Sequence, residues 1–225
     1  MCNYWGELLP DVKLVLAYGG TQEEFDGIDW QDKVFIDDQT LRTKNHQREC
    51  QSYTAVYRGV LGLLSGRGFD RILLTEFDHV PLRSDYFNLL ELARDEARAD
   101  VMMYGLYQVN DIGHAHSLYH ATKVLFFEQI ERISLRSEKD VVFSSYGFGQ
   151  YWQWEAFEEM AKVNDEVGCY LEIWAPTIAH HLGFRVKRIK DVEKCNNYYG
   201  DFTDRVEELK NRGGWCAHPV KKYWD

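Results

Sequence analysis

The chain has 225 residues, 45% of them hydrophobic and 15% aromatic, and carries a net charge of −10 at pH 7. This length and apolar content suffice for the core of one α/β domain, while the acidic balance argues against a general nucleic-acid surface, which needs a basic stripe to neutralise phosphates. Five scattered cysteines without a C-x-x-C pair argue against a disulfide framework or structural zinc and favour a reducing compartment.

The N-terminal residues lack a basic stretch followed by an apolar one, and no segment reaches the apolar length that spans a bilayer. We therefore expect a cytoplasmic protein without a transmembrane segment.

The first two predicted strands end at residues suited to ligand contact. Residues 12–18 form the first, which stops at Gly19-Gly20, where backbone can approach a ligand closely. Residues 33–36 form the second, which ends at Asp37-Asp38.

An amphipathic helix follows over 53–64, because its apolar residues recur at i, i+3, i+4, i+7 and i+8. Gly66 and Gly68 end it.

The next strand carries the most informative residues of the chain. The apolar run 72–74 predicts a buried strand, and Glu76 and Asp78 follow it two residues apart. Side chains at that spacing point the same way, so both carboxylates can converge on one divalent cation beyond the carboxyl end of the strand. The alternative is that they are solvated, or that one caps the helix beginning near Ser84.

Periodicity and turn residues predict the remaining elements. These are a helix from 84, strands at 101–107 and 122–127, a polar loop over 110–120, helices at 150–163 and 171–182, a strand at 185–189 and a helix at 203–212. Strands alternating with helices indicate one α/β domain with a central, mostly parallel mixed sheet flanked by helices.

This order of elements resembles the GT-A fold nucleotide-sugar-dependent glycosyltransferases over nearly the whole chain. In that family a D-x-D motif holds Mn²⁺ or Mg²⁺ on the donor diphosphate, and the matching segment here is Glu76-Phe77-Asp78. The departure is Glu for the first Asp, which leaves Asp78 as the better expected ligand. The resemblance implies a single GT-A-like, Rossmann-like domain over 1–225, with a nucleotide- and metal-binding half (1–108) and an acceptor-binding half with a C-terminal flap (109–225).

The same resemblance implies a nucleotide site and a sugar or acceptor site. The expected nucleotide contacts are Tyr18, Gly19, Gly20, Asp37, Arg48, Gln51 and Lys221. The expected sugar or acceptor contacts are Gly147, Trp152, Trp154 and Trp174. For the aromatic residues the alternative is an ordinary place in the core.

Glu172 is the candidate general base. The segment 170–186 resembles the family region in which an acid precedes a helix and a G-[FY]-[RK]-V strand and faces the acceptor. Such an acid deprotonates the attacking hydroxyl in an inverting enzyme. The alternative is a carboxylate that only stabilises the helix N-terminus.

The segment 215–222 resembles a C-terminal H-P-x-K element that folds back over the donor. It implies His218 as the third metal ligand and Lys221 as a diphosphate contact. The alternative is a solvated tail.

A competing zinc site at His114, His116 and His120 is disfavoured, because the segment reads as a polar loop without a nearby carboxylate or cysteine ligand. We therefore expect a metal-dependent glycosyltransferase that moves a sugar to a hydroxyl acceptor, in surface polysaccharide or glycoconjugate assembly. The alternatives are a sugar-1-phosphate nucleotidylyltransferase, disfavoured by the acidic loop 19–24, and a non-catalytic nucleotide- or glycan-binding module.

Overall fold

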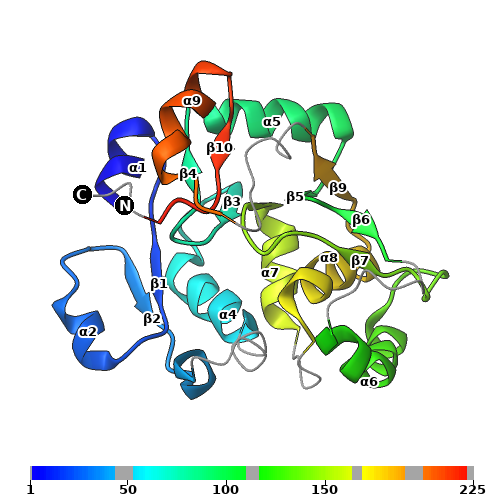
Figure 1. The fold of residues 1–225 in the computed structure, drawn as a ribbon. Helices are drawn as coiled ribbons and strands as arrows, with labels where there is room; N and C mark the ends of the chain where they lie inside the picture. The colour runs from blue at the N-terminus through cyan, green and yellow to red at the C-terminus, as the bar shows by residue number, and fades with distance from the viewer. Residues whose placement is uncertain (1, 44–52, 110–116, 164–168, 191–199, 222–225) are drawn as a thin grey trace.

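The computed structural model describes residues 2–43, 53–109, 117–163, 169–190 and 200–221. These residues form an α/β structure whose helices lie on both sides of a small mixed sheet (Figure 1). The expected α/β class with mixed sheets is confirmed. No helix within these ranges is both long and apolar enough to cross a membrane.

The elements follow one another in an irregular alternation. The first half contains α1 (Cys2–Leu8), β1 (Leu16–Tyr18), α2 (Gln22–Gly27), β2 (Lys33–Phe35), η1 (Gln39–Arg42), α4 (Tyr53–Leu64), β3 (Arg71–Leu74), β4 (Val80–Pro81), α5 (Tyr86–Ala97), β5 (Val101–Tyr104) and β6 (Tyr107–Gln108). The second half contains α6 (Ser117–Ile133), β7 (Phe143–Ser144), β8 (Gln150–Gln153), α7 (Trp154–Lys162), α8 (Leu171–His181), β9 (Val186–Ile189), η3 (Thr203–Arg205), α9 (Val206–Asn211) and β10 (Cys216–Ala217).

Four strands in the order β3-β8-β5-β9 form the central sheet. β8 is antiparallel to both β3 and β5, and β5 is parallel to β9, so three strands share one direction and β8 alone opposes them. Because β8 lies between β3 and β5, residues from both halves of the chain share this sheet.

The remaining described strands form pairs of their own. β1 and β2 are parallel, whereas β4 with β10 and β6 with β7 are antiparallel. In the described part of the chain β1 has no ladder to β3, so the sheet is divided where one continuous sheet was expected. The expected mostly parallel pairing is also wrong for the central sheet, because β8 lies antiparallel between β3 and β5 and makes two of its three strand pairs antiparallel.

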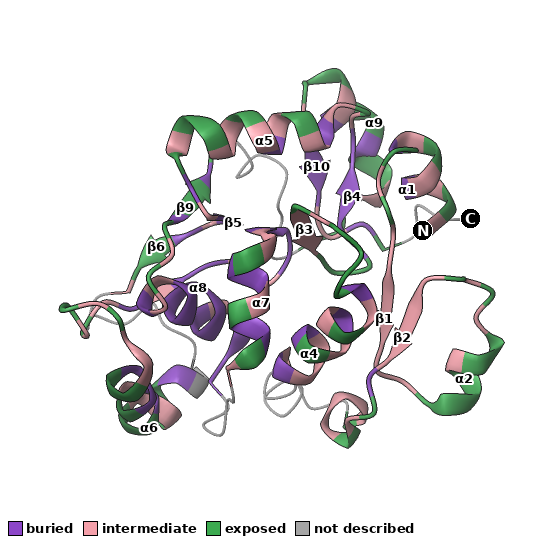
Figure 2. Ribbon diagram, turned by 180° about the vertical axis from the view of Figure 1, so that it is seen from behind, coloured by how far each residue is buried: buried purple, intermediate pink, exposed green. Residues whose placement is uncertain are grey.

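The central sheet has a hydrophobic cluster on each face. Met103 and Trp152 point into the cluster that α4, α6, α7 and α8 cover, whereas Met102 and Tyr151 point into the cluster under α1, α5 and α9. Alternation along β5 and β8 produces this division, because successive strand side chains point to opposite faces. α8 is buried along most of its length, whereas α6 shows a broad exposed face (Figure 2).

Two expected elements are wrong. The predicted strand 122–127 lies inside α6, where Tyr119, Phe126 and Ile130 face the core at helical spacing. Residues 150–153, expected to be helical, form β8 between two other strands. In both places tertiary packing overrides local propensity.

Candidate metal and carboxylate site

The site forms where strand ends and a helix start converge. β3 ends at Leu74, opposite Gln150 at the start of β8. The loop before β8 is fixed to its neighbours by two backbone hydrogen bonds, from the N–H of Tyr146 to the carbonyl of Tyr104 (2.9 Å) and from the N–H of Ser145 to the carbonyl of Glu172 (2.8 Å). The carboxyl ends of β3 and β5 therefore meet the N-terminus of α8, the edge of an α/β sheet at which ligands bind.

The C-terminal segment folds back onto this edge. β10 pairs with β4, and the N–H of Leu82 donates to the carbonyl of Trp215 (2.9 Å). The N–H of Val220 donates to the carbonyl of Asp78 (2.9 Å). These backbone bonds place His218 beside Glu76 and Asp78, although 140 or so residues separate them in sequence.

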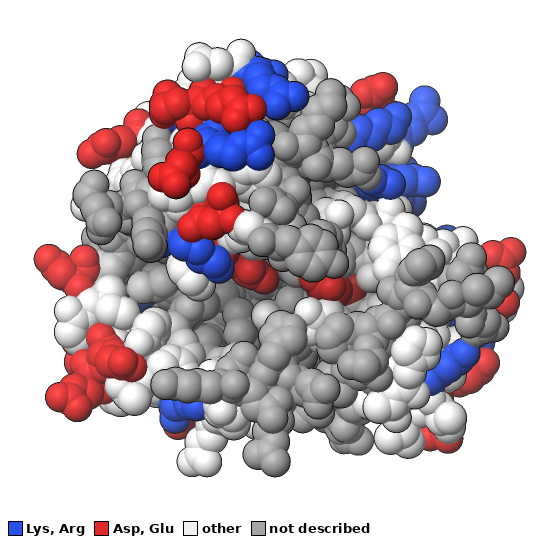
Figure 3. All heavy atoms as spheres, in the orientation of Figure 1, with Lys and Arg blue, Asp and Glu red and all other residues white. Residues whose placement is uncertain are grey.

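Glu76, Asp78 and His218 form a compact cluster, which we call the acid–imidazole cluster. Nε2 of His218 lies 3.2 Å from Oε2 of Glu76 and 3.3 Å from Oδ1 of Asp78. One ligand-type atom from each of the three residues lies within 4.8 Å of the others. On the face seen in Figure 3, acidic side chains are visible in a central hollow.

Asp78 is the buried member of the cluster. Its side chain is 2% exposed, and Lys221 forms an ion pair with Oδ2. Burial raises the pKa of Asp78, but the His218 imidazole and the Lys221 ammonium outweigh it and lower the pKa to about 2. Asp78 is therefore ionised at neutral pH. Its Oδ1 atom is buried and accepts no well-aligned hydrogen bond from the described residues.

His218 is held by stacking as well as by charge. Its ring stacks on Phe148 with centroids 3.9 Å apart and an interplanar angle of 21°. Burial lowers the pKa of His218, but the opposing effect of the Asp78 and Glu76 carboxylates is larger. The pKa of His218 is therefore raised overall. The two carboxylates thus favour the protonated form of His218, and Asp78 also pairs with the Lys221 ammonium.

The donor set fits a hard divalent cation. Two carboxylates and one imidazole leave positions for substrate oxygens, an arrangement that suits Mn²⁺ or Mg²⁺. The buried Oδ1 of Asp78, which accepts no well-aligned hydrogen bond from the described residues, and the Lys221 ammonium paired with Oδ2 of the same carboxylate are two signs that the cluster attracts a cation.

Glu172 lies next to the acid–imidazole cluster, in the first turn of α8. Its Oε1 accepts a hydrogen bond from the N–H of Gly147 (3.1 Å). Burial raises the pKa of Glu172 to about 7; Glu76 adds to the rise, and the Gly147 N–H and His218 oppose it. A carboxyl with this pKa can take up and release a proton near neutral pH.

Beneath the cluster lies a buried polar chain that the sequence interpretation missed. Nδ1 of His79 lies 2.5 Å from Oγ1 of Thr75, and its Nε2 lies 3.1 Å from the hydroxyl of Tyr86, which is 2.8 Å from that of Tyr104. Burial and the nearby His218 lower the pKa of His79 to about 3, against the opposing effect of Asp78. The neutral ring supports the 76–78 turn. In the sequence, the position of His79 directly after Asp78 could have indicated that it belongs to the site.

Phe77 was also missed as a separate site residue. It stands between the two carboxylates, is 65% exposed, and has the Lys221 ammonium 5.4 Å from its ring centroid. An exposed aromatic ring beside a polar site offers a stacking surface to a ligand.

Four of the residues expected to contact a nucleotide, Tyr18, Gly19, Gly20 and Asp37, lie around the ends of β1 and β2. The Tyr18 hydroxyl donates to Glu24 (2.9 Å), and Asp37 pairs with Arg42 (3.0 Å). Gly19 and Gly20 are close to neighbouring side chains, since an added Cβ would lie 2.5 Å from Leu41 and 2.4 Å from the Tyr18 hydroxyl. Lys221 contacts Asp78. Arg48 and Gln51 lie outside the described residues.

The expected aromatic sugar platform is corrected at three positions. Trp152 and Trp174 are 0% and 1% exposed and pack edge-on against Tyr57 in the core. Trp154 directly follows β8, at the end of the sheet opposite to Glu76. Its backbone N–H donates there to the carbonyl of Asp70 (3.0 Å). Gly147 alone of the four lies at the cluster.

Of the disfavoured histidine site, His114 and His116 lie outside the described residues, and His120 lies in α6.

The chain matches no protein-family model, no curated protein and no solved structure.

Proposed function

We propose that the protein is a metal-dependent glycosyltransferase that moves a sugar from a nucleoside diphosphate donor to a hydroxyl acceptor. One observation carries the proposal: a cation-attracting cluster and a carboxyl with a pKa near 7 lie on either side of Gly147. An added Cβ at Gly147 would lie 3.0 Å from Oε1 of Glu76 and 3.7 Å from Oε1 of Glu172. Transfer of a sugar from a diphosphate needs both functions within one substrate's reach.

Glu76, Asp78 and His218 would hold Mn²⁺ or Mg²⁺ together with oxygens of the donor diphosphate. When bound, the cation stabilises the negative charge that develops on the leaving diphosphate. Lys221, which pairs with Asp78 in the absence of a ligand, would contact the negatively charged diphosphate at the same place.

Glu172 acts as the general base. Its carboxylate accepts the proton of the acceptor hydroxyl, and the hydroxyl oxygen forms a bond to the anomeric carbon of the donor sugar. The bond from that carbon to the diphosphate oxygen breaks, and its electron pair leaves with the nucleoside diphosphate. The Gly147 N–H orients the carboxylate for this step.

The nucleoside would lie against the ends of β1 and β2, where Tyr18, Gly19, Gly20 and Asp37 are located. Phe77 adds an aromatic surface at the cluster end. Within this proposal the reaction belongs to cytoplasmic assembly of a polysaccharide or glycoconjugate.

Calorimetric titration with UDP, GDP, CDP and ADP and their common sugar conjugates, first with Mn²⁺ and then with EDTA, tests the proposal. We expect one nucleotide to bind in Mn²⁺ and to lose at least about tenfold in affinity in EDTA. Absence of binding to every nucleotide in Mn²⁺ would contradict the proposal. Metal-dependent binding without transfer to any hydroxyl acceptor would favour the non-catalytic module.

A further inference from the structure

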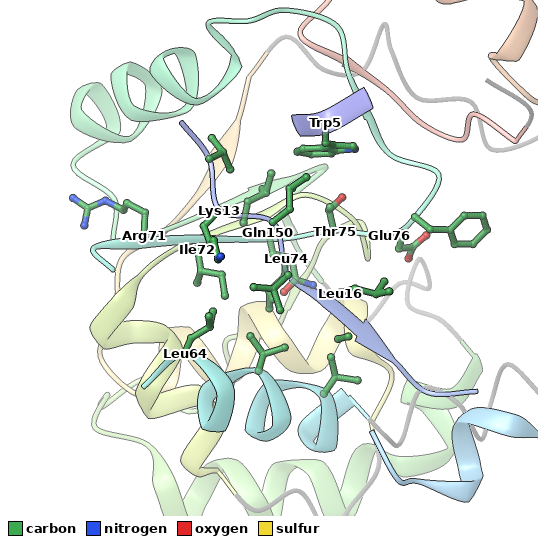
Figure 4. Close-up of a pocket in the computed structure, with 18 of the residues that line it drawn as sticks. Trp5, Lys13, Leu16, Leu64, Arg71, Ile72, Leu74, Thr75, Glu76 and Gln150 are labelled. Carbon is green, nitrogen blue, oxygen red and sulfur yellow. The ribbon is translucent and has the colours of Figure 1, made fainter. Parts of the chain in front are cut away.

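A large cavity opens directly beside the site. Its volume is about 640 Å³, and it lies between β3 on one side and β1 and α4 on the other. Figure 4 shows it extending along β3, with Arg71 at one end and Glu76 at the other, and with Trp5 facing it from α1. The volume falls within the roughly 300–1,000 Å³ of small-molecule pockets.

The middle of the cavity is apolar. The side chains that line it there belong to β1, α4 and β3, and include Leu16, Val56, Val60, Leu64, Ile72 and Leu74. Apolar side chains exposed to such a cavity are stabilised when an apolar ligand removes their surface from water. The lining therefore favours a hydrocarbon occupant.

Three polar side chains on the wall, those of Gln150, Arg71 and Lys13, have partners within the protein. Oε1 of Gln150 accepts from the Tyr57 hydroxyl (2.6 Å), and its Nε2 donates to the carbonyl of Gly147 (3.2 Å). At the far end Arg71 pairs with Glu91 (3.2 Å) and Lys13 with Asp32. These groups do not require a polar occupant, and a nucleoside base, which presents donors and acceptors along its edge, would find them engaged.

The near end of the cavity meets the proposed chemistry. Glu76, Gly147 and Leu171 line it there, and Leu171 directly precedes Glu172 in α8. The Gly147 N–H that lies at this end donates to Glu172. An elongated ligand in the cavity would thus place one polar end between the acid–imidazole cluster and the candidate base.

We propose that this cavity binds the hydrocarbon part of the acceptor, and that the acceptor is an aliphatic chain ending in a hydroxyl group. The proposal rests on the glycosyltransferase function for the role of the hydroxyl, whereas binding of the chain rests on the cavity alone. The alcohol proton passes to Glu172, the alcohol oxygen bonds to the anomeric carbon, and the nucleoside diphosphate leaves with the electron pair.

The test is calorimetric titration of the full chain with primary n-alcohols from hexanol to dodecanol, in EDTA and without nucleotide. We expect the Kd to fall about fourfold for each added methylene until the cavity is filled. Leu16→Phe in β1 and Val56→Phe in α4 each fill part of the cavity and should weaken decanol binding at least about tenfold. Val124→Phe, at a position that is 72% exposed on α6, is the matched control and should bind as the wild type does.

Three results would overturn binding of the chain. These are no binding of any alcohol, equal binding by both filled variants and the control, or displacement of decanol by uridine or guanosine.

A second measurement separates this proposal from the proposed function. Nucleotide binding fails or succeeds independently, because the alcohol titration contains neither metal nor nucleotide. With a bound donor and Mn²⁺, mass spectrometry should detect the alkyl glycoside of decanol. Donor binding and decanol binding without this product would overturn the acceptor assignment while leaving the donor site intact.

Discussion

Gly147 is the residue at which the cation cluster and the candidate base meet. Any side chain there would occupy the space between the Glu76 and Glu172 carboxylates, since even a Cβ would lie 3.0 Å from Oε1 of Glu76. Its N–H also fixes Glu172. Glycine thus allows two acidic groups to face one substrate while its backbone orients one of them.

Replacement of Glu172 tests the role of the base. Glu172→Gln keeps the shape and can still accept the Gly147 N–H, but it cannot take a proton, so we expect kcat for transfer to fall about a hundredfold or more with donor Kd nearly unchanged. Steady-state kinetics and donor titration measure the two effects. Glu155→Gln is the matched control, because Glu155 occupies the second position of α7 as Glu172 does of α8, but is exposed. Normal transfer by Glu172→Gln would remove Glu172 from the mechanism.

The site residues could be predicted from sequence where a chemically suitable side chain stands at the end of a strand or the start of a helix. Carboxylates two apart after an apolar strand, and an acid in the first turn of a helix, locate Glu76, Asp78 and Glu172 from sequence. Trp152 and Trp174 were assigned to a sugar site because large aromatic rings serve both cores and binding surfaces. Only their burial separates the two roles, and burial depends on packing that the sequence does not state.

α8 connects the site to the far side of the molecule. Its first turn holds Glu172, and its last turn holds His180 and His181. Nδ1 of His181 lies 2.9 Å from Ser134 Oγ, and its Nε2 lies 2.8 Å from the carbonyl of Val141. These contacts anchor the C-terminus of the helix that positions Glu172.

The pKa of His180 makes stability depend on pH. Burial lowers it to about 4, and His181 and Arg136 add to the effect. Between about pH 6.5, the pKa of an unfolded histidine, and about pH 4, the unfolded chain binds a proton at His180 that the folded chain does not. The contribution of the neutral His180 ring to the free energy of unfolding is therefore complete above pH 6.5 and is lost as the pH falls towards 4. We expect His180→Gln to reduce the slope of unfolding free energy over this range by roughly 1 kcal/mol per pH unit.

Urea unfolding of the wild type and His180→Gln at several pH values measures this slope. The pair at about pH 8 serves as the reference, because His180 is then neutral in both folded and unfolded states. Equal slopes below pH 6.5 would show that the ring protonates freely in the folded protein.

Elements were predictable from sequence when their pattern was long and unambiguous. The stripe in α4 and the apolar run of β3 give the expected elements. Residues 122–127 are rich in β-formers, but the buried Tyr119, Phe126 and Ile130 recur at helical spacing across and beyond that window and fix the helix through core contacts. β8 was missed because its pairing with β3 and β5 comes from distant parts of the chain.

At the scale of the whole molecule, the site depends on long-range assembly. β4 and β10 bring the C-terminal segment to the 76–78 turn, and β8 places the Gly147 loop between β3 and α8. Sequence could supply the candidate ligands, but their meeting, the division of the sheet at β1 and the cavity beside it arise from packing between distant segments.

Glu76, Asp78 and His218 together should hold one divalent cation. Titration of Mn²⁺ followed by the electron paramagnetic resonance signal of the free ion tests it most directly. We expect one site in the wild type and in Asp85→Asn, a control at a carboxylate that pairs with Arg83 away from the cluster. Asp78→Asn should bind at least about tenfold more weakly, since loss of even an outer partner of a metal site costs this much. No Mn²⁺ binding by the wild type, or equal affinity in Asp78→Asn, would show that this cluster is not a metal site.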